Sequence, residues 1–341
     1  MKQSDVALRA CGRAIALGLL LVVATGASAT VVSGRVTNVT GSGIANVDLD
    51  FVNRDTDENI PLVGDDTDPL GFYAVTVPVG DYDVRFNPPK GVRYAAHEER
   101  GVQVQGGSMT LDATLDDAWL VSGRVVDEFA APLVNVDLDF VDMIDGGDAY
   151  VSNDSSDAAG QFTVAVRATT YQIEFEPPLG MPRAPRRLDD VVVSGDVALG
   201  DIVLDPGFTL SGVVRNGVAT GLGSILVRTT DPWTGDEIFS IRNVTDGTGA
   251  YSFLVAAGNY TLELIPPRGA RQLPRRVAGV AVSGALALPA IVLDDGVLVR
   301  GRVLDPGGSP AAGTDLDFVS ALSDHRMWTP RDNADDGGDF E

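Results

Sequence analysis

The feature of this 341-residue chain that most limits its fold is a repeat with a fixed spacing of 89 residues. The pentapeptide VDLDF occurs at 47–51 and at 136–140, and the variant TDLDF occurs at 314–318. The same interval separates four glycines, Gly34, Gly123, Gly212 and Gly301. No residue is inserted or deleted between the copies, which indicates that one unit was duplicated. The period is that of a small domain and exceeds the roughly 20–50 residues of a solenoid repeat.

The repeat divides the chain into a leader and four units. We expect a signal peptide at 1–29, complete units at 30–118, 119–207 and 208–296, and a truncated unit at 297–341. No Pro- or Ser-rich linker intervenes, so neighbouring units should abut closely. The truncated unit lacks the second half of the repeat, so we expect it not to fold stably alone.

Hydrophobic and polar residues alternate inside each unit. In VDLDF, Val47, Leu49 and Phe51 fall on one side of an extended strand, and Asp48 and Asp50 fall on the other. Turn residues recur about every ten positions, and no part of the mature chain shows a sustained helical period. The pattern predicts an all-β protein made of tandem seven-stranded β-sandwiches, arranged as beads on a string.

The leader has the composition of a secretory signal peptide. Lys2, Arg9 and Arg13 precede an apolar run at 14–24, and an Ala-Ser-Ala sequence ends at Ala29. The run is shorter than the roughly 20 residues of a membrane-spanning helix, so we expect an exported protein with no membrane insertion after cleavage. The single cysteine lies in the leader, so the mature protein has no disulfide.

The formal net charge of −23 limits the possible partners. An acidic surface repels phosphate groups, which argues against nucleic acid and anionic lipid. We therefore expect an unidentified extracellular protein or polysaccharide as partner. The expected location is secreted, extracellular or cell-surface, in a bacterium.

Two turn motifs recur in phase. In D-x-x-G-x-[FY] the aspartate should accept backbone N–H bonds and the glycine should supply a positive φ. In G-x-Y the tyrosine should bury its ring and bond its hydroxyl to the backbone. In the second unit Thr169 replaces the glycine of G-x-Y, so we expect a different turn there. The aspartates, glycines and tyrosines are Asp68, Asp157 and Asp246, then Gly71, Gly160 and Gly249, then Tyr82, Tyr171 and Tyr260.

These motifs, preceded in each unit by an SGRV-like segment and a PLVNVDL-like strand (132–138), resemble the carboxypeptidase regulatory-like domain. The resemblance covers the mature chain as three complete copies and one partial copy. It implies a transthyretin-like, or prealbumin-like, β-sandwich, similar to collagen-adhesin B-type and starch-binding-like modules. The related zinc carboxypeptidase activity would reside in a separate catalytic domain.

Catalytic motifs are not found in the sequence. The two histidines, His97 and His325, lack the H-x-x-E pair of a zinc carboxypeptidase, and no G-x-S-x-G segment is present. The acidic residues recur with the repeat at positions expected on the surface. This pattern indicates solvated side chains and disfavours the pair of catalytic carboxylates that a glycosidase needs. Lys90 is the only lysine of the mature chain, so units two and three cannot form an isopeptide crosslink. We therefore expect that the protein is not an enzyme and that it has no catalytic, cofactor-binding or metal-binding residues.

Calcium is the one cofactor that the sequence leaves open as an alternative to ordinary turn chemistry. Calcium takes oxygen ligands, and carboxylates cluster near the turns of units one and two. The third unit has Leu226 and Arg228 in place of the aspartate pair, so it should bind calcium less well than the first two. The clustered carboxylates are Asp65, Asp66, Asp68, Asp142, Asp145, Asp148, Asp154 and Asp157.

Aromatic and basic residues suggest two further possibilities. Trp119, Trp233 and Trp328 occupy unrelated phases of the repeat, so no repeated sugar-binding platform is expected. Arginine pairs recur at 186–187 and 275–276. These arginines either pair with nearby aspartates or contact the next unit.

The function predicted from these observations is a non-catalytic array of β-sandwich modules with a structural, adhesive or spacer role. One alternative is a carbohydrate-binding accessory protein with the starch-binding-like fold. Another is the stalk of a larger enzyme whose catalytic domain follows residue 341.

Overall fold

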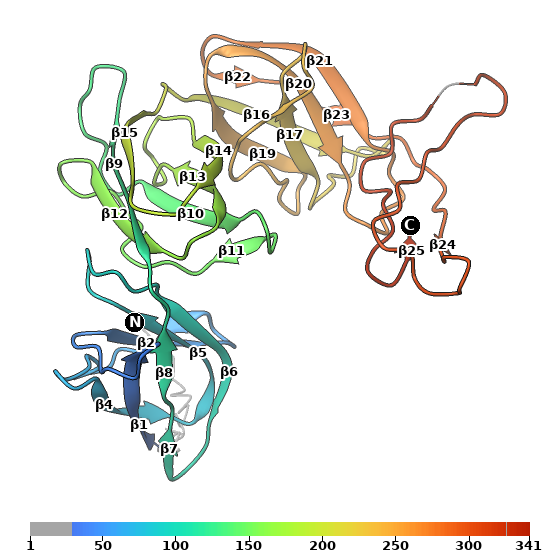
Figure 1. The fold of residues 1–341 in the computed structure, drawn as a ribbon. Helices are drawn as coiled ribbons and strands as arrows, with labels where there is room; N and C mark the ends of the chain where they lie inside the picture. Colours follow the sequence, from blue (N-terminus) through green and yellow to red (C-terminus); the bar gives the residue numbers. More distant parts are fainter. Residues whose placement is uncertain (1–28, 325) are drawn as a thin grey trace, which may run out of the picture.

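The computed structural model describes residues 29–324 and 326–341, and every regular element in these ranges is a β-strand. No helix in the described part of the chain is long and apolar enough to cross a membrane. The strands form successive modules in chain order (Figure 1). The predicted signal peptide lies outside the described residues, apart from Ala29, which begins the first strand.

The first module is a sandwich of two four-stranded sheets. One sheet has the order β4-β1-β7 with β8 also paired to β1, and the other has the order β3-β2-β5-β6. Strand β1 is antiparallel to β4 and parallel to β7 and β8. The strands are β1 (Ala29–Asn38), β2 (Asp48–Asn53), β3 (Glu58–Asn59), β4 (Phe72–Pro78), β5 (Gly80–Asn87), β6 (His97–Val104), β7 (Ser108–Thr110) and β8 (Ala113–Leu115).

The second module repeats this scheme with seven strands. Its sheets have the orders β12-β9-β15 and β11-β10-β13-β14. A single strand, β15, takes the place of β7 and β8, with a register shift between Ala198 and Asp201. The strands are β9 (Trp119–Val126), β10 (Asp137–Asp142), β11 (Gly147–Ala149), β12 (Gln161–Val166), β13 (Thr170–Glu176), β14 (Arg186–Val192) and β15 (Val197–Val203).

The third module again has the broken form of the last strand. Its sheets have the orders β19-β16-β22, with β23 also paired to β16, and β18-β17-β20-β21. The predicted repeated all-β sandwich is therefore confirmed, with seven strands when each broken strand counts once. The strands are β16 (Phe208–Arg215), β17 (Leu226–Thr230), β18 (Glu237–Ile238), β19 (Ala250–Val255), β20 (Gly258–Ile265), β21 (Arg275–Val282), β22 (Leu286–Ala287) and β23 (Ile291–Val292).

Each sandwich has a hydrophobic core of its own, and the three cores span 32–115, 121–204 and 210–293. The alternation read from the sequence produces these cores. Val47, Leu49 and Phe51 are all 0% exposed, while the intervening aspartates lie on the outer face of the sheet. Burial of these side chains supplies the stability of a module that has no disulfide.

The two turn motifs have the predicted geometry. Gly71, Gly160 and Gly249 have φ values of 85°, 75° and 81°. Each motif tyrosine donates its hydroxyl to the backbone oxygen four residues earlier, as Tyr171 does to Arg167 at 3.1 Å. The different turn expected at Thr169 is wrong. Because glycine at this position of the other units has no positive φ, threonine fits the same turn.

The fourth segment is mostly irregular. Within the described residues of 297–341, the regular elements are two short strands, β24 (Gly301–Arg302) and β25 (Asp339–Phe340), and the only buried hydrophobic residue is Ala334. The TDLDF segment at 314–318 forms no strand, contrary to the sequence pattern. In units one and two the matching strand pairs with β5 or β13, and the described residues offer no counterpart here.

Candidate functional site

The outer face of the second sandwich carries a group of three acidic side chains. Asp139 lies on β10, and Glu174 and Glu176 lie on the neighbouring strand β13. The register pairs Asp139 with Glu174, and alternation turns all three side chains away from the core. One carboxylate oxygen of each residue lies within 4.8 Å of the others. We take this acidic face (Asp139, Glu174, Glu176) as the candidate functional site, because it brings three carboxylates together.

Burial and the charges of neighbouring carboxylates raise the pKa of every member of the acidic face. The pKa of Glu176 rises to about 7, first through burial and then through the charges of Asp139 and Glu174. The pKa values of Asp139 and Glu174 are raised mainly by burial. Nearby, burial and the charge of Asp137 raise the pKa of Asp154 to about 6. The face can therefore take up protons near neutral pH, and its oxygens are the type that hard cations prefer.

The same positions carry different side chains in the other modules. In the first module they are Asp50, Arg85 and Asn87, and the Asn87 amide donates to Asp50 at 2.8 Å. In the third module they are Arg228, Glu263 and Ile265, and Arg228 Nε donates to Glu263 at 2.8 Å. Only in the second module, among the three complete ones, do three acids occupy these positions.

Three of the carboxylates considered as calcium ligands, Asp68, Asp142 and Asp157, accept backbone N–H groups of turns. Asp157 accepts the backbone N–H groups of Ala159 and Gln161 at 2.9 and 2.8 Å, and these bonds lower its pKa. Asp142 likewise accepts the N–H of Ile144 at 2.8 Å at the tip of a hairpin. Among the described residues, the structure gathers Asp139, Glu174 and Glu176 rather than these loop residues.

Sequence reasoning missed Glu174 and Glu176. Their alternation within YQIEFE could have placed them on an outer face. Their approach to Asp139 depends on the pairing register of β10 with β13, which the sequence does not state.

The paired arginines have two separate roles. Arg186 and Arg275 donate to the backbone oxygens of Val203 and Val292 at 3.0 and 2.7 Å, within their own modules. Arg187 and Arg276 also bond acidic residues of their own modules. In addition, both lie over an aromatic ring of the following unit.

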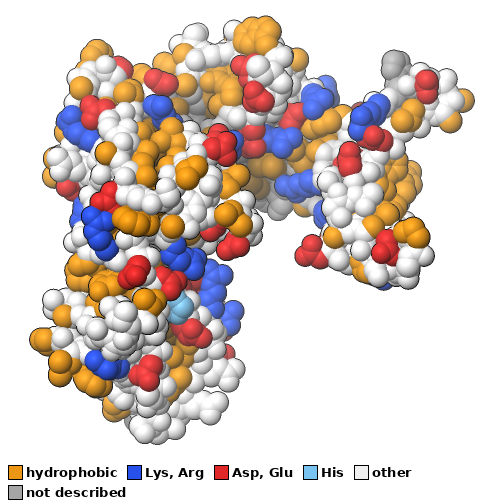
Figure 2. Space-filling view, in the orientation of Figure 1, with side chains coloured by type: hydrophobic (Ala, Val, Ile, Leu, Met, Phe, Trp, Pro, Cys, Tyr) orange, Lys and Arg blue, Asp and Glu red, His pale blue; other side chains and the backbone are white. Residues whose placement is uncertain are grey.

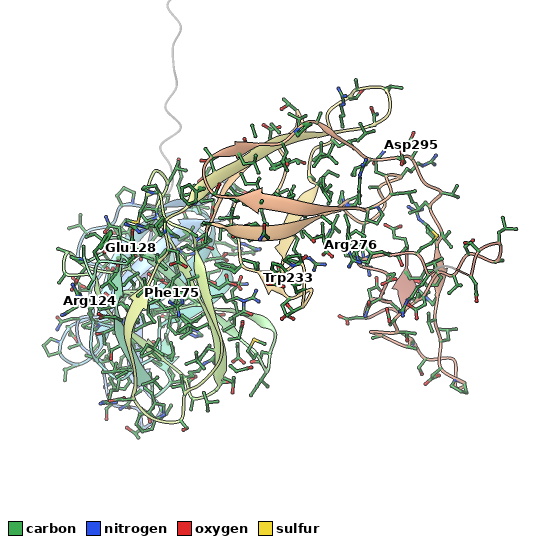
Figure 3. All side chains as sticks on the ribbon, turned by 90° about the horizontal axis from the view of Figure 1, so that it is seen from above. Arg124, Glu128, Phe175, Trp233, Arg276 and Asp295 are labelled. Atoms are coloured by element: carbon green, nitrogen blue, oxygen red, sulfur yellow. The ribbon has the colours of Figure 1, made fainter. Side chains whose placement is uncertain are left out.

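One tryptophan stands out by its exposure. Trp233 is 77% exposed at the tip of the hairpin between β17 and β18, and it is labelled in Figure 3. Its repeat counterparts are Asp55, Ile144 and Leu322, and the last two are 76% and 101% exposed. A hydrophobic hairpin tip therefore occurs in the later units but not in the first module, and the aromatic ring occurs in the third module alone.

Comparison with known proteins gives no family assignment. No family model and no curated protein matches the chain. Solved structures that resemble it include the Bacillus anthracis TIE protein, with 12% identity and a TM-score of 0.23 over 79% of this chain and 51% of that one. The major pilin subunit BcpA of Bacillus cereus matches with 12% identity and a TM-score of 0.23, over 78% of this chain and 99% of that one.

A third resemblance is to the shaft pilin SpaA from Lactobacillus rhamnosus GG, with 11% identity and a TM-score of 0.23 over 52% of this chain and 97% of that one. The chain spans about half the length of the TIE protein. At such low TM-scores these likenesses define no function for the chain.

Proposed function

We propose that the chain is an exported, non-catalytic array of β-sandwich modules that acts as a structural spacer or adhesive segment, secreted or on a cell surface. The carboxypeptidase regulatory-like resemblance is part of this proposal. The motifs that carry this resemblance form turns with in-phase positive-φ glycines and tyrosine-to-backbone bonds. Its partner would be an extracellular protein or a polysaccharide.

One observation carries the proposal. Three modules with separate cores follow one another at a constant interval, and only three or four residues separate the last strand of one from the first strand of the next. These short connections are 116–118 and 204–207. Such an array sets a distance along its length, which is what a spacer requires.

Carbohydrate binding is the alternative with a specific observation behind it. Sugars stack on exposed aromatic rings, and Trp233 is the most exposed tryptophan among the described residues. Asp55, Ile144 and Leu322 at the matching positions provide no ring for stacking. Sugar binding would therefore be a property of the third module alone, which favours the structural role.

The spacer role can be tested by removing one period. Deletion of 119–207 joins two equivalent positions of the repeat, so the remaining modules should fold as before. We expect small-angle scattering to show a maximum dimension shorter by about one module. Unfolding of the remaining modules after this deletion would contradict the proposal.

The non-catalytic and adhesive aspects need separate measurements. Mature protein incubated with zinc and peptides should release no C-terminal residue, and zinc-dependent release would contradict the proposal. Retention on a panel of insoluble polysaccharides, lost in Trp233→Ala, would favour the carbohydrate-binding alternative. Recovery of the mature protein in the medium or on intact cells tests export.

A further inference from the structure

Each linker between modules is bonded to the module that precedes it. Between the first two modules, the Ala95 N–H donates to Asp116 O at 2.9 Å, and the Ala118 N–H donates to Arg93 O at 3.0 Å. Both bonds recur one and two periods later. The linkers are therefore held in place rather than free to rotate. The recurring bonds run from Ala184 to Asp205, Gly207 to Pro182, Leu273 to Asp294 and Gly296 to Arg271.

An aromatic ring of each following unit lies on an arginine of the preceding module. Tyr150, Phe239 and Trp328 occupy one position of the repeat, 89 residues apart. Cation–π contacts of this kind are attractive when the guanidinium lies within about 6 Å of the ring centroid. Figure 3 labels Arg276, which lies on the side of the third module toward the fourth segment. The distances to the ring centroids are 5.2 Å for Arg85–Tyr150, 5.8 Å for Arg187–Phe239 and 4.2 Å for Arg276–Trp328.

The arginine in these contacts belongs to a cross-strand pair whose charges are reversed in the first module. There Arg85 on β5 pairs in register with Glu98 on β6, and the two side chains bond at 2.9 Å. One period later the same two positions hold Glu174 and Arg187, again in register. Two periods later they hold Glu263 and Arg276, bonded at 2.8 Å. One arginine and one glutamate are kept in every module, and the next aromatic ring meets the arginine on either strand.

The first joint shows how closely the aromatic residue is seated. The Tyr150 hydroxyl donates to Asn87 Oδ1 at 2.5 Å, and Asn153 donates its side-chain amide to Pro88 O at 3.2 Å. Burial raises the pKa of Tyr150 above its usual value. Basic and acidic side chains meet where these modules adjoin (Figure 2), around a cavity of about 300 Å³ that includes Glu98 and Tyr150.

We propose that one sheet of each complete module is, on its outer face, a docking site for the aromatic loop of the next unit. These sheets are β3-β2-β5-β6, β11-β10-β13-β14 and β18-β17-β20-β21. The docking contact joins the arginine of the Arg/Glu pair to the aromatic ring of the next unit that lies over it. These joints fix the angle between neighbouring modules and make the array stiff. The inference deepens the proposed spacer role, and its failure would leave the folded modules intact, so the two can be told apart.

The mature chain has no cysteine, which allows clean site-specific labelling. Nitroxide labels on Ala159→Cys and Thr248→Cys report the distance between equivalent exposed turns of modules two and three. In the unmodified joint, double electron–electron resonance should give one narrow distance peak. Phe239→Ala should remove that narrow peak, because the ring no longer meets Arg187. Trp233→Ala is the matched control, since it removes an exposed ring from the same hairpin without touching the joint.

The charge reversal supplies a second test. Arg187→Glu alone should broaden the distance distribution as Phe239→Ala does. Addition of Glu174→Arg recreates the arrangement of the first module and should restore the narrow peak, which mere loss of stability would not explain. Equal distributions for Phe239→Ala and Trp233→Ala, or no recovery in the reversed pair, would overturn the proposal. Circular dichroism of each variant confirms that the modules stay folded.

Discussion

At the scale of single residues, a buried hydroxyl joins two loops in every complete module. In the second module, Ser156 Oγ accepts the N–H of Val136 at 2.9 Å and donates to Leu133 O at 2.8 Å. Thr67 and Thr245 make the same two bonds in the other modules. The fourth segment has Ala334 at this position, so it lacks the link.

Removing the hydroxyl should destabilise the module. Ser156 is 2% exposed, so Ser156→Ala leaves the buried N–H of Val136 and the partly buried carbonyl of Leu133 without their partner. We expect the free energy of unfolding of the second module to fall by about 1–3 kcal/mol. Urea unfolding of the mature chain measures this, with the exposed Ser155→Ala as control. Equal unfolding curves for both variants would contradict the role assigned to the hydroxyl.

The acidic face makes stability depend on pH. In the folded state Glu176 has a pKa of about 7, above its usual 4.5. Its raised pKa favours folding at acidic pH, and this contribution is lost as the pH rises from about 4.5 through about 7. Glu176→Gln should therefore raise the stability of the second module at pH 8, by about 1–2 kcal/mol after screening by solvent.

At pH 4 the Glu176→Gln variant and the unmodified protein should be equally stable, because Glu176 is then mostly protonated. Urea midpoints at both pH values test this, and the exposed Glu58→Gln on β3 should change neither midpoint. A stabilisation of the same size at pH 4 and pH 8 would show that the ionisation of Glu176 is not the cause.

At the scale of elements, the D-x-x-G-x-[FY] turn demands its glycine. Gly160 has a φ of 75°, and a Cβ atom there would lie 2.5 Å from Val125 O. Gly160→Ala should therefore lower the free energy of unfolding by about 1–3 kcal/mol or more. Gly195→Ala is the control, because that glycine has no positive φ and open space around it. Comparable thermal midpoints for the two variants would contradict this account of the turn.

Most strands could be predicted from local patterns, because alternation and turn residues specify them directly. The fourth TDLDF segment could not, because a strand needs a neighbour as well as a pattern. The strands β3, β11 and β18 could not be predicted either, because two or three residues are too few to show an alternation of hydrophobic and polar side chains. The acidic face depends on register between strands about 35 residues apart, which one sequence does not reveal.

At the scale of the whole molecule, the joints depend on information that single motifs do not contain. The sequence predicted close contact between units and suggested that the paired arginines reach the next unit. The common phase of Tyr150, Phe239 and Trp328 is hidden in the sequence because the three units carry three different aromatic residues at this position. The reversed Arg/Glu pairs become visible only when strand register is known.

Mechanical unfolding of single molecules of the mature chain is the most direct test of whether the modules fold separately. Each complete repeat should unfold in one event and release about 250–300 Å of extended chain. We expect three such events of equal length, with no fourth event of that size from 297–341. A single event that releases the whole chain, or lengths unrelated to the 89-residue period, would contradict the account.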